Sequence, residues 1–227
     1  MAAKSFVLCD VNKFEKEDFQ FDYQSEFFED DENFMGEGTP KVSLSSDKNK
    51  FNHMCYRKIL GSYDYIHQKK GKVFNKYFSR YFEEFKFPIY YNENESFLMI
   101  QIKTDVGLEF IESINSNENF NVKVINIDFE KIVQNVPEIS GAWIAELKSK
   151  HLKSTGLFGP KVNLSEEYKE AINEGEISSM IITFIYDSCE FKVNISRKGS
   201  VTLLNKIASP EQEIEILNEI YTQLLKK

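Results

Sequence analysis

The sequence predicts an α+β protein in which an antiparallel sheet packs against helices. Between residues 179 and 206, runs rich in β-branched residues alternate with short turn sequences, as expected of consecutive antiparallel strands. Residues 209–225 then have the capping residues and the apolar spacing of an amphipathic helix. Hydrophobic residues make up 41% of the 227 residues, which is enough for an ordinary globular core. The 20 phenylalanines and 11 tyrosines predict that this core is rich in aromatic side chains.

The first 50 residues combine aromatic and acidic side chains. Residues 19–23 (FQFDY) alternate aromatic and polar residues, and this period of two predicts a strand. The Gly, Pro, Ser and Asp content of residues 36–50 predicts a loop or linker.

Residues 51–87 are predicted to form an aromatic-rich helical segment in the N-terminal half. Six aromatic residues recur at helical spacing and would share one face, namely Phe74, Tyr77, Phe78, Tyr81, Phe82 and Phe85. Lys72, Lys76 and Arg80 are spaced by four and would share another face. Pro88 is expected to end the helix because it lacks a backbone N–H. A domain boundary is therefore expected near residue 90, between segments 1–90 and 91–227.

The middle of the chain alternates strand-like and helix-like runs. The expected elements are a strand at 97–103, a helix at 104–114 with Thr104 as its N-cap, strands at 120–127 and 139–147, a loop at 148–161 and a helix capped by Ser165. The strand, helix and strand between residues 97 and 127 predict a parallel or split pairing. The strand at 139–147 contains Trp143, the only tryptophan.

The C-terminal segment predicts a β-β-β-α unit. Residues 179–186 and 190–195 should form a hairpin, and Gly199 supplies the positive φ that the next turn, SRKGS, requires. After a third strand, Ser209 is the expected N-cap of a helix with Pro210 at its first position, and Gln212 is expected to reach back as in a capping box.

This last unit, EFKVNISRKGSVTLLNK followed by SPEQEIEILNEIYTQLL, resembles one half of the TATA-box-binding-protein fold. The resemblance covers residues 179–227 and implies a sheet backed by a helix in a domain associated with nucleic acid. The phenylalanines that this family inserts between base pairs have no counterpart in this segment, so minor-groove binding is not implied.

The net charge of −8 is unevenly distributed along the sequence. Residues 1–40 have 11 acidic and 3 basic side chains, whereas residues 41–90 have 11 basic and 4 acidic side chains. Such asymmetry is typical either of a nucleic-acid surface beside an acidic arm, or of two blocks that neutralise each other within the fold.

The best functional hypothesis is a non-enzymatic protein that binds nucleic acid or a nucleic-acid-associated protein. Cations release counterions from phosphates, and exposed aromatic rings stack on unpaired bases. The candidate binding residues are Lys69, Lys70, Lys72, Lys76, Arg80, Lys150, Lys153, Arg197 and Lys198. The alternative for the same segment is that the aromatic residues form core and the lysines are only solvated.

Two further hypotheses remain open. In one, Glu146 and Lys148, with Asp128 or Glu138 upstream, resemble the D…(D/E)-x-K pattern of a metal-dependent nuclease family. In the other, the acidic segment 15–32 binds a basic partner protein. No sequence pattern indicates a bound cofactor or a zinc site.

Composition also predicts the cellular setting. Cys9, Cys55 and Cys189 are widely spaced and predict reduced thiols. There is no secretory signal and no apolar run of roughly 18 residues, so a cytoplasmic location without membrane contact is expected. The many Lys, Asn, Ile and Phe residues use AT-rich codons, which indicates a bacterial, phage or mobile-element genome.

Overall fold

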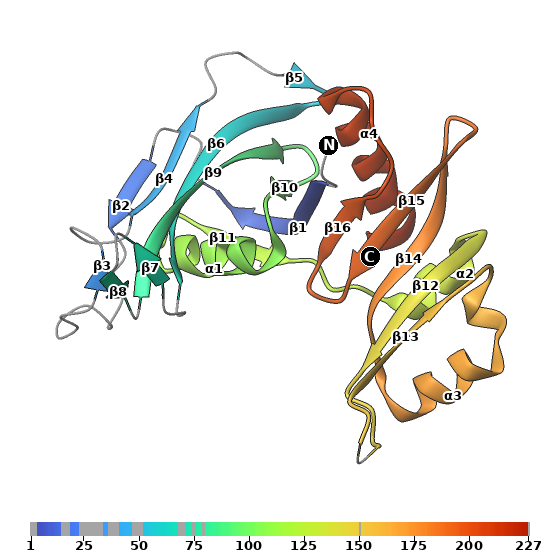
Figure 1. Ribbon diagram of the computed structural model, residues 1–227. Coiled ribbons are helices and arrows are strands. Elements are labelled where there is room, and N and C mark those ends of the chain that lie inside the picture. The colour runs from blue at the N-terminus through green and yellow to red at the C-terminus, as the bar shows by residue number, and fades with distance from the viewer. Residues whose placement is uncertain are drawn as a thin grey trace. The chain divides into compact units, whose positions relative to one another are not determined.

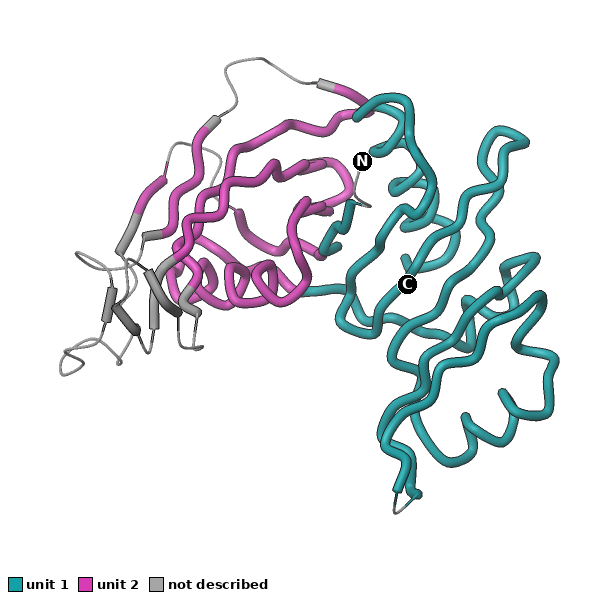
Figure 2. The backbone as a smooth tube through the Cα atoms, viewed as in Figure 1, with its two compact units in different colours: residues 1–8, 124–227 teal, residues 9–123 magenta. Residues whose placement is uncertain are grey.

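The computed structural model describes residues 4–14, 19–22, 34–35, 41–46, 52–67, 71–73, 76–78, 80–149 and 151–226. The chain forms two compact units (Figure 2): unit 1 comprises residues 1–8 and 124–227, and unit 2 comprises residues 9–123. Strand β1 (Lys4–Lys13) begins in unit 1 and ends in unit 2. The boundary expected near residue 90 falls inside β9 (Arg80–Asn92), because this strand pairs along its length with β6 (Tyr56–His67) of the same unit.

Unit 1 contains a sheet with the strand order β13-β12-β14-β15-β16-β1 (Figure 1). Its remaining strands are β12 (Glu138–Ala145), β13 (Ser154–Phe158), β14 (Glu176–Tyr186), β15 (Cys189–Ser196) and β16 (Ser200–Leu203). Its helices are α2 (Phe129–Asn135), α3 (Glu166–Glu174) and α4 (Pro210–Ile220), which continues as a π-helical turn (Tyr221–Leu225). Each neighbouring strand pair is antiparallel.

Alternate residues of these strands face the helices. Ala142 and Ile144 of β12 pack with Tyr168 of α3 in one buried cluster. Met180 of β14 pairs with Ala142, so its side chain faces the same side of the sheet. Ile182, two residues further along β14, faces that side too, and both Met180 and Ile182 are fully buried. We call this side the helix face and the opposite side the open face.

Unit 2 contains a second antiparallel run, in the order β1-β10-β9-β6-β4-β2. Its further elements are β2 (Phe19–Asp22), β4 (Lys41–Ser46), β10 (Phe97–Gln101), β11 (Asn121–Val124), β3 (Phe34–Met35), β5 (Asn52–His53), the β7–β8 pair (Gly71–Val73 and Lys76–Phe78) and helix α1 (Thr104–Asn115). Phe110 of α1 packs against Tyr63 of β6 and Phe87 of β9, with ring centroids 6.0 and 5.0 Å apart. The helix therefore covers one face of this sheet.

The predicted α+β class is confirmed, and so is the β-β-β-α order of β14, β15, β16 and α4. Gly199 has φ +73°, and Ser209 caps α4 by accepting from the Gln212 N–H. The capping box is only partly as predicted, because Gln212 accepts from the Ala208 N–H. The split pairing is confirmed, since β10 and β11 both pair with β1.

The predicted helix at 51–87 is wrong. Most of its described part forms the strands β6 and β9, which pair in register from Tyr56–Asn92 to His67–Tyr81. Aromatic and β-branched side chains favour extended backbone, and here inter-strand packing outweighs the helical spacing. Pro88 lies opposite Leu60 within β9 and does not end an element.

Three smaller predictions also need correction. Thr104 is the first residue of α1, and Lys103 occupies the N-cap position without a side-chain cap. The predicted loops at 36–50 and 148–161 contain strands β4 and β13, because pairing of β4 with β6 and β2, and of β13 with β12, outweighs the turn-forming residues of these stretches. Within the described ranges, no helix is long and apolar enough to cross a membrane.

Candidate nucleic-acid interface and a second groove

The predicted cationic helix face of the N-terminal half does not exist as proposed. Lys69 and Lys70 lie outside the described residues. Lys72 and Lys76 lie on two different strands of the β7–β8 pair, opposite Tyr77 and Val73 respectively, and Arg80 begins β9. Lys72, Lys76 and Arg80 therefore lie on three strands and do not share a helix face. The acidic segment 15–32 is described only at β2, so most of it also lies outside the described residues.

The other predicted cations come together at one end of the unit 1 sheet. Lys150 is outside the described residues, but Lys153 immediately precedes β13. Ala145 of β12 pairs with Ser154 on one side and with Glu176 on the other, which spans two strand spacings, or about 10 Å. Arg197, in the turn between β15 and β16, forms an ion pair with Glu176. Two basic patches that are more than 40 residues apart in the sequence thus lie near each other.

The charges at this end are not equally available. Arg197 is neutralised by Glu176, so it contributes little net positive charge. Lys148 and Lys153 are exposed and form no ion pair with another residue of the described ranges. Lys198 is exposed beside Arg197. Lys148 and Lys153 therefore supply exposed positive charge at this end.

An aromatic pair, Trp143 and Phe158, lies on the open face. Trp143 is two residues from Ala145, which pairs with Ser154, whereas Phe158 is at the end of β13 away from Lys153. The two rings are edge to face with centroids 4.8 Å apart, and Phe158 is 63% exposed. Gly156 of the same strand and Gly141 of β12 make room for the phenyl ring. A Cβ at Gly156 would lie 3.0 Å from Phe158 Cε2, and one at Gly141 would lie 3.1 Å from Phe158 Cδ1. The pair therefore rests on the sheet without being covered by it.

Polar side chains continue the open face away from the aromatic pair. The register places Ser179 opposite Ser196, and Ile181 opposite Asn194, which in turn pairs with Thr202. The Asn194 Oδ1 atom is buried and accepts no hydrogen bond from any described residue. Since a buried polar atom without a partner is unfavourable, this oxygen is a candidate acceptor for a water molecule.

A hydrogen-bonded network of Glu138, Thr183 and Lys192 borders this polar row. The Lys192 Nζ atom donates to Glu138 at 3.0 Å and to Thr183 Oγ1 at 2.7 Å, while Thr183 Oγ1 donates to Glu138 at 3.0 Å. The ammonium group of Lys192, followed by the Thr183 hydroxyl, lowers the pKa of the Glu138 carboxyl. The Glu138 carboxylate thus already accepts hydrogen bonds from Lys192 and Thr183.

The three carboxylates of the nuclease hypothesis, Asp128, Glu138 and Glu146, each have different neighbours. Asp128 accepts from the Lys131 N–H and caps α2, and Glu138 belongs to the network with Lys192. Glu146 is exposed in a turn with φ +56°. Among the residues that the structure describes, no three His, Cys, Asp or Glu side chains are grouped so that they could hold a metal ion.

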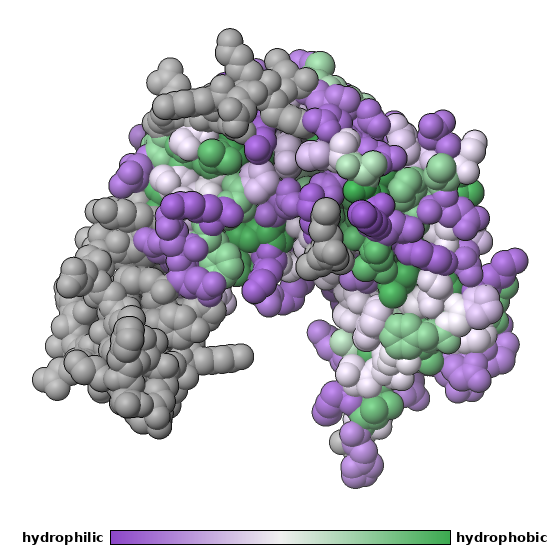
Figure 3. All heavy atoms as spheres, turned by 45° about the horizontal axis from the view of Figure 1, so that its top comes forward, coloured by the Kyte–Doolittle hydropathy of each residue, from purple (hydrophilic) through white to green (hydrophobic). Residues whose placement is uncertain are grey.

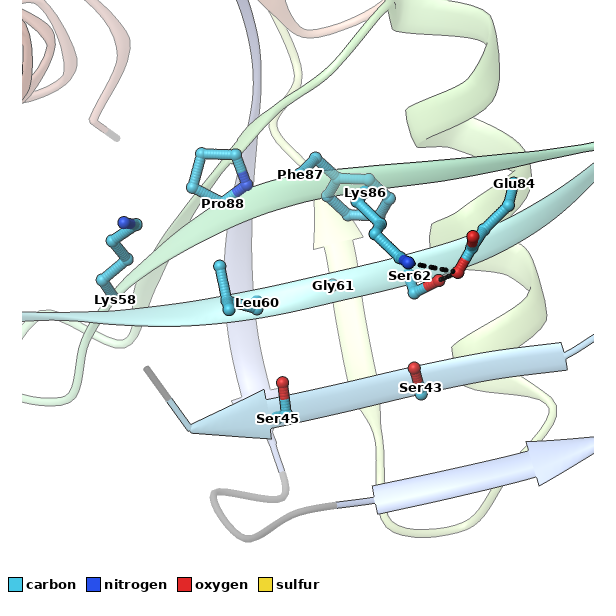
Figure 4. Close-up of a pocket in the computed structure, with 10 residues that line it drawn as sticks. All are labelled: Ser43, Ser45, Lys58, Leu60, Gly61, Ser62, Glu84, Lys86, Phe87 and Pro88. Carbon is cyan, nitrogen blue, oxygen red and sulfur yellow. Dashed lines mark hydrogen bonds and ion pairs between the residues drawn. The ribbon is translucent and has the colours of Figure 1, made fainter. Parts of the chain in front are cut away.

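Unit 2 has a shallow groove of its own, formed on the side of β4, β6 and β9 opposite α1 (Figure 4). Its volume is about 500 Å³, and it is lined by Ser43, Ser45, Lys58, Leu60, Gly61, Ser62, Glu84, Lys86, Phe87 and Pro88. Leu60 is 43% exposed and lies opposite Pro88, so a small apolar ledge crosses an otherwise polar groove.

The charged groups of this groove bind one another. Ser62 Oγ donates to Glu84 at 2.9 Å, and Lys86 Nζ lies 3.1 Å from the same oxygen (Figure 4). Hydrogen bonds from Lys86 and then Ser62 lower the pKa of Glu84. A carboxylate with a lowered pKa is a weak general base, so this contact does not activate Ser62 as a nucleophile.

The space-filling view shows hydrophobic residues exposed at several places between hydrophilic ones (Figure 3). On the open face of unit 1, sequence reasoning placed Trp143 in a strand but missed its partner, because residues 148–161 were interpreted as a loop. Residues 154–158 (STGLF) show no alternation of polar and apolar residues, so no periodic signal in the sequence indicates this strand. No family model and no curated protein matches the chain.

Proposed function

We propose that unit 1 binds single-stranded nucleic acid on its open face. The observation that carries this proposal is the Trp143–Phe158 pair, because a 63% exposed phenyl ring held against an indole is available to stack on a base. Stacking of this kind requires an unpaired base, so the expected ligand is a single strand rather than a duplex.

The surroundings of the pair support a polyanionic, hydrogen-bonding ligand. Lys153 and Lys198 are exposed at the end of the sheet nearer to Trp143 than to Phe158, and they would contact phosphates that flank the stacked base. Thr202, which is half-buried, would bond a base edge through its hydroxyl group. Only a few cations are available, and the whole chain has a net charge of −8, so we expect modest affinity.

The test is a titration of the full chain with labelled single- and double-stranded oligonucleotides at two salt concentrations. Because base stacking contributes about 1–3 kcal/mol, Phe158→Ala should weaken single-strand binding roughly 5- to 150-fold. Leu164→Ala is the matched control, since Leu164 is 64% exposed and precedes α3. Each phosphate contact removed in Lys153→Ala or Lys198→Ala should reduce the log–log salt slope by about 0.7. No binding at low salt, or equal loss in Phe158→Ala and Leu164→Ala, contradicts the proposal.

A further inference from the structure

Strand β13 has a backbone edge that the fold leaves without a partner strand. β13 lies at the end of the strand order, and β12 is the only described strand that pairs with it. Residues Ser154–Phe158 show an alternating exposed and half-buried pattern, and none is buried. The edge is therefore accessible as far as the described residues extend.

The register identifies which amides point outward. Gly159 N–H donates to the Ser140 carbonyl, and the antiparallel pairing continues with Phe158 opposite Gly141. Hydrogen-bonded and non-hydrogen-bonded pairs alternate in such a ladder, so Thr155 and Leu157 bond to β12. The N–H and C=O groups of Ser154, Gly156 and Phe158 consequently point away from the sheet.

The sequence of β13 lacks the usual protection of an edge strand. Exposed edges are normally blunted by charged residues or proline within the strand, because a bare edge templates pairing with another chain. Residues 154–158 (STGLF) contain neither. The bare edge thus has the features of a strand that accepts another strand.

The flanking charges specify the kind of partner. Residues 148–165 contain Lys148, Lys150, Lys153 and Lys161 and no acidic side chain, within a chain of net charge −8. Lys153 and Lys161 are exposed on either side of the strand. Acidic side chains on an added strand would meet these lysines, whereas a basic segment would be repelled.

We propose that β13 docks an extended acidic segment of a partner protein by strand addition. The backbone ladder to Ser154, Gly156 and Phe158 supplies the affinity, and the lysines at both ends select acidic sequences. This site uses the outer edge of the sheet and goes beyond the proposed binding of nucleic acid on the open face.

The experiment uses the immobilised full chain and a synthetic pool of nine-residue peptides in which acidic residues alternate with Val, Thr, Ile or Phe. A pool with lysine in place of the acidic residues is the charge control. The best retained peptide is then titrated in solution, with Trp143 fluorescence as the signal because Trp143 pairs directly with Gly156 of β13. A copy of that peptide with alternate N-methylated amides keeps the side chains but cannot form the ladder.

The expected result is retention of the acidic pool only, with at least tenfold weaker binding of the N-methylated peptide. Ser154→Pro removes one outward N–H at the first position of an edge strand, where proline is tolerated, and should weaken binding about tenfold. Ser154→Ala keeps that N–H and should bind as the wild type does. Hydrogen exchange should slow at Ser154, Gly156 and Phe158 on binding, and these amides should exchange quickly in the free chain.

Several outcomes would overturn the proposal: equal retention of both pools, unweakened binding after N-methylation, or unchanged exchange at the three outward amides. Slow exchange at these amides in the free chain together with a dimeric mass would mean that a second copy occupies the edge. Oligonucleotide binding of Ser154→Pro should equal that of the wild type, so failure here is distinguishable from failure of the nucleic-acid proposal.

Discussion

Gly199→Ala should destabilise unit 1 strongly, and the magnitude follows from local geometry. Gly199 has φ +73°, and a left-handed conformation costs a non-glycine residue about 1–2 kcal/mol. An added Cβ would also lie 2.1 Å from Val124 Cγ1 and 3.0 Å from the Ile125 carbonyl oxygen. Overpacking of this kind costs about 1–3 kcal/mol. We therefore expect a total loss of about 2–5 kcal/mol, or a fall in Tm of roughly 4–20 °C.

The assay is equilibrium urea unfolding followed by the fluorescence of Trp143, which lies in unit 1. Gly199→Asn separates the two causes, because asparagine tolerates positive φ but also has a Cβ. If the steric contact dominates, Asn should be nearly as destabilising as Ala.

A double-mutant cycle with Val124→Ala tests the same contact directly. Removing Val124 Cγ1 relieves the 2.1 Å approach, so the double variant should be at least about 0.5 kcal/mol more stable than additivity predicts. Strict additivity, or a loss below about 1 kcal/mol in Gly199→Ala, would refute the reasoning.

Three further predictions follow from capping, thiol burial and tyrosine ionisation. Ser209→Ala removes the acceptor for the Gln212 N–H at the start of α4 and should cost about 1 kcal/mol in urea unfolding; an unchanged free energy of unfolding would contradict the stabilising role of this cap. Burial raises the pKa of the Cys9 thiol, so N-ethylmaleimide should label Cys9 only on unfolding. The exposed Cys55 and Cys189 should be labelled quickly. Rapid labelling of all three thiols would contradict the burial of Cys9. Burial also raises the pKa of Tyr168, so the folded chain keeps this proton at pH values where the unfolded chain releases it. The free energy of unfolding should therefore fall as pH rises above about 10, and Tyr168→Phe should lose less stability there than the wild type; equal losses would argue against this cause.

The sequence predicted best where local chemistry decides the structure. Gly199 and Ser209 sit at a turn and a helix start whose requirements are met by neighbouring residues, so both were placed correctly. The hairpin between β14 and β15 also followed from short-range signals, and its turn residues Asp187 and Ser188 have positive φ as a two-residue turn requires.

The prediction of a helix at 51–87 failed because a local pattern does not specify the partner strand. The stretch contains both helical spacing and alternation, such as buried Ile59 and Tyr63 around the exposed Leu60. β6 pairs with residues of β9 that lie 14 to 36 positions further along the chain, from His67–Tyr81 to Tyr56–Asn92. This pairing satisfies the backbone and buries Tyr63 and Phe87 against α1. The basic helix face disappeared with that helix.

The candidate interface was likewise beyond the reach of single segments. By itself, the sequence determined the α+β class, the C-terminal β-β-β-α order and the lysine-rich segment 148–165. These features depend on composition and on neighbours in the chain. Only the tertiary structure decided that Phe158 stands beside Trp143, that Lys153 lies near Arg197 and that β13 ends the sheet. These relations depend on strand order and register, which are set by the packing of the whole sheet against its helices.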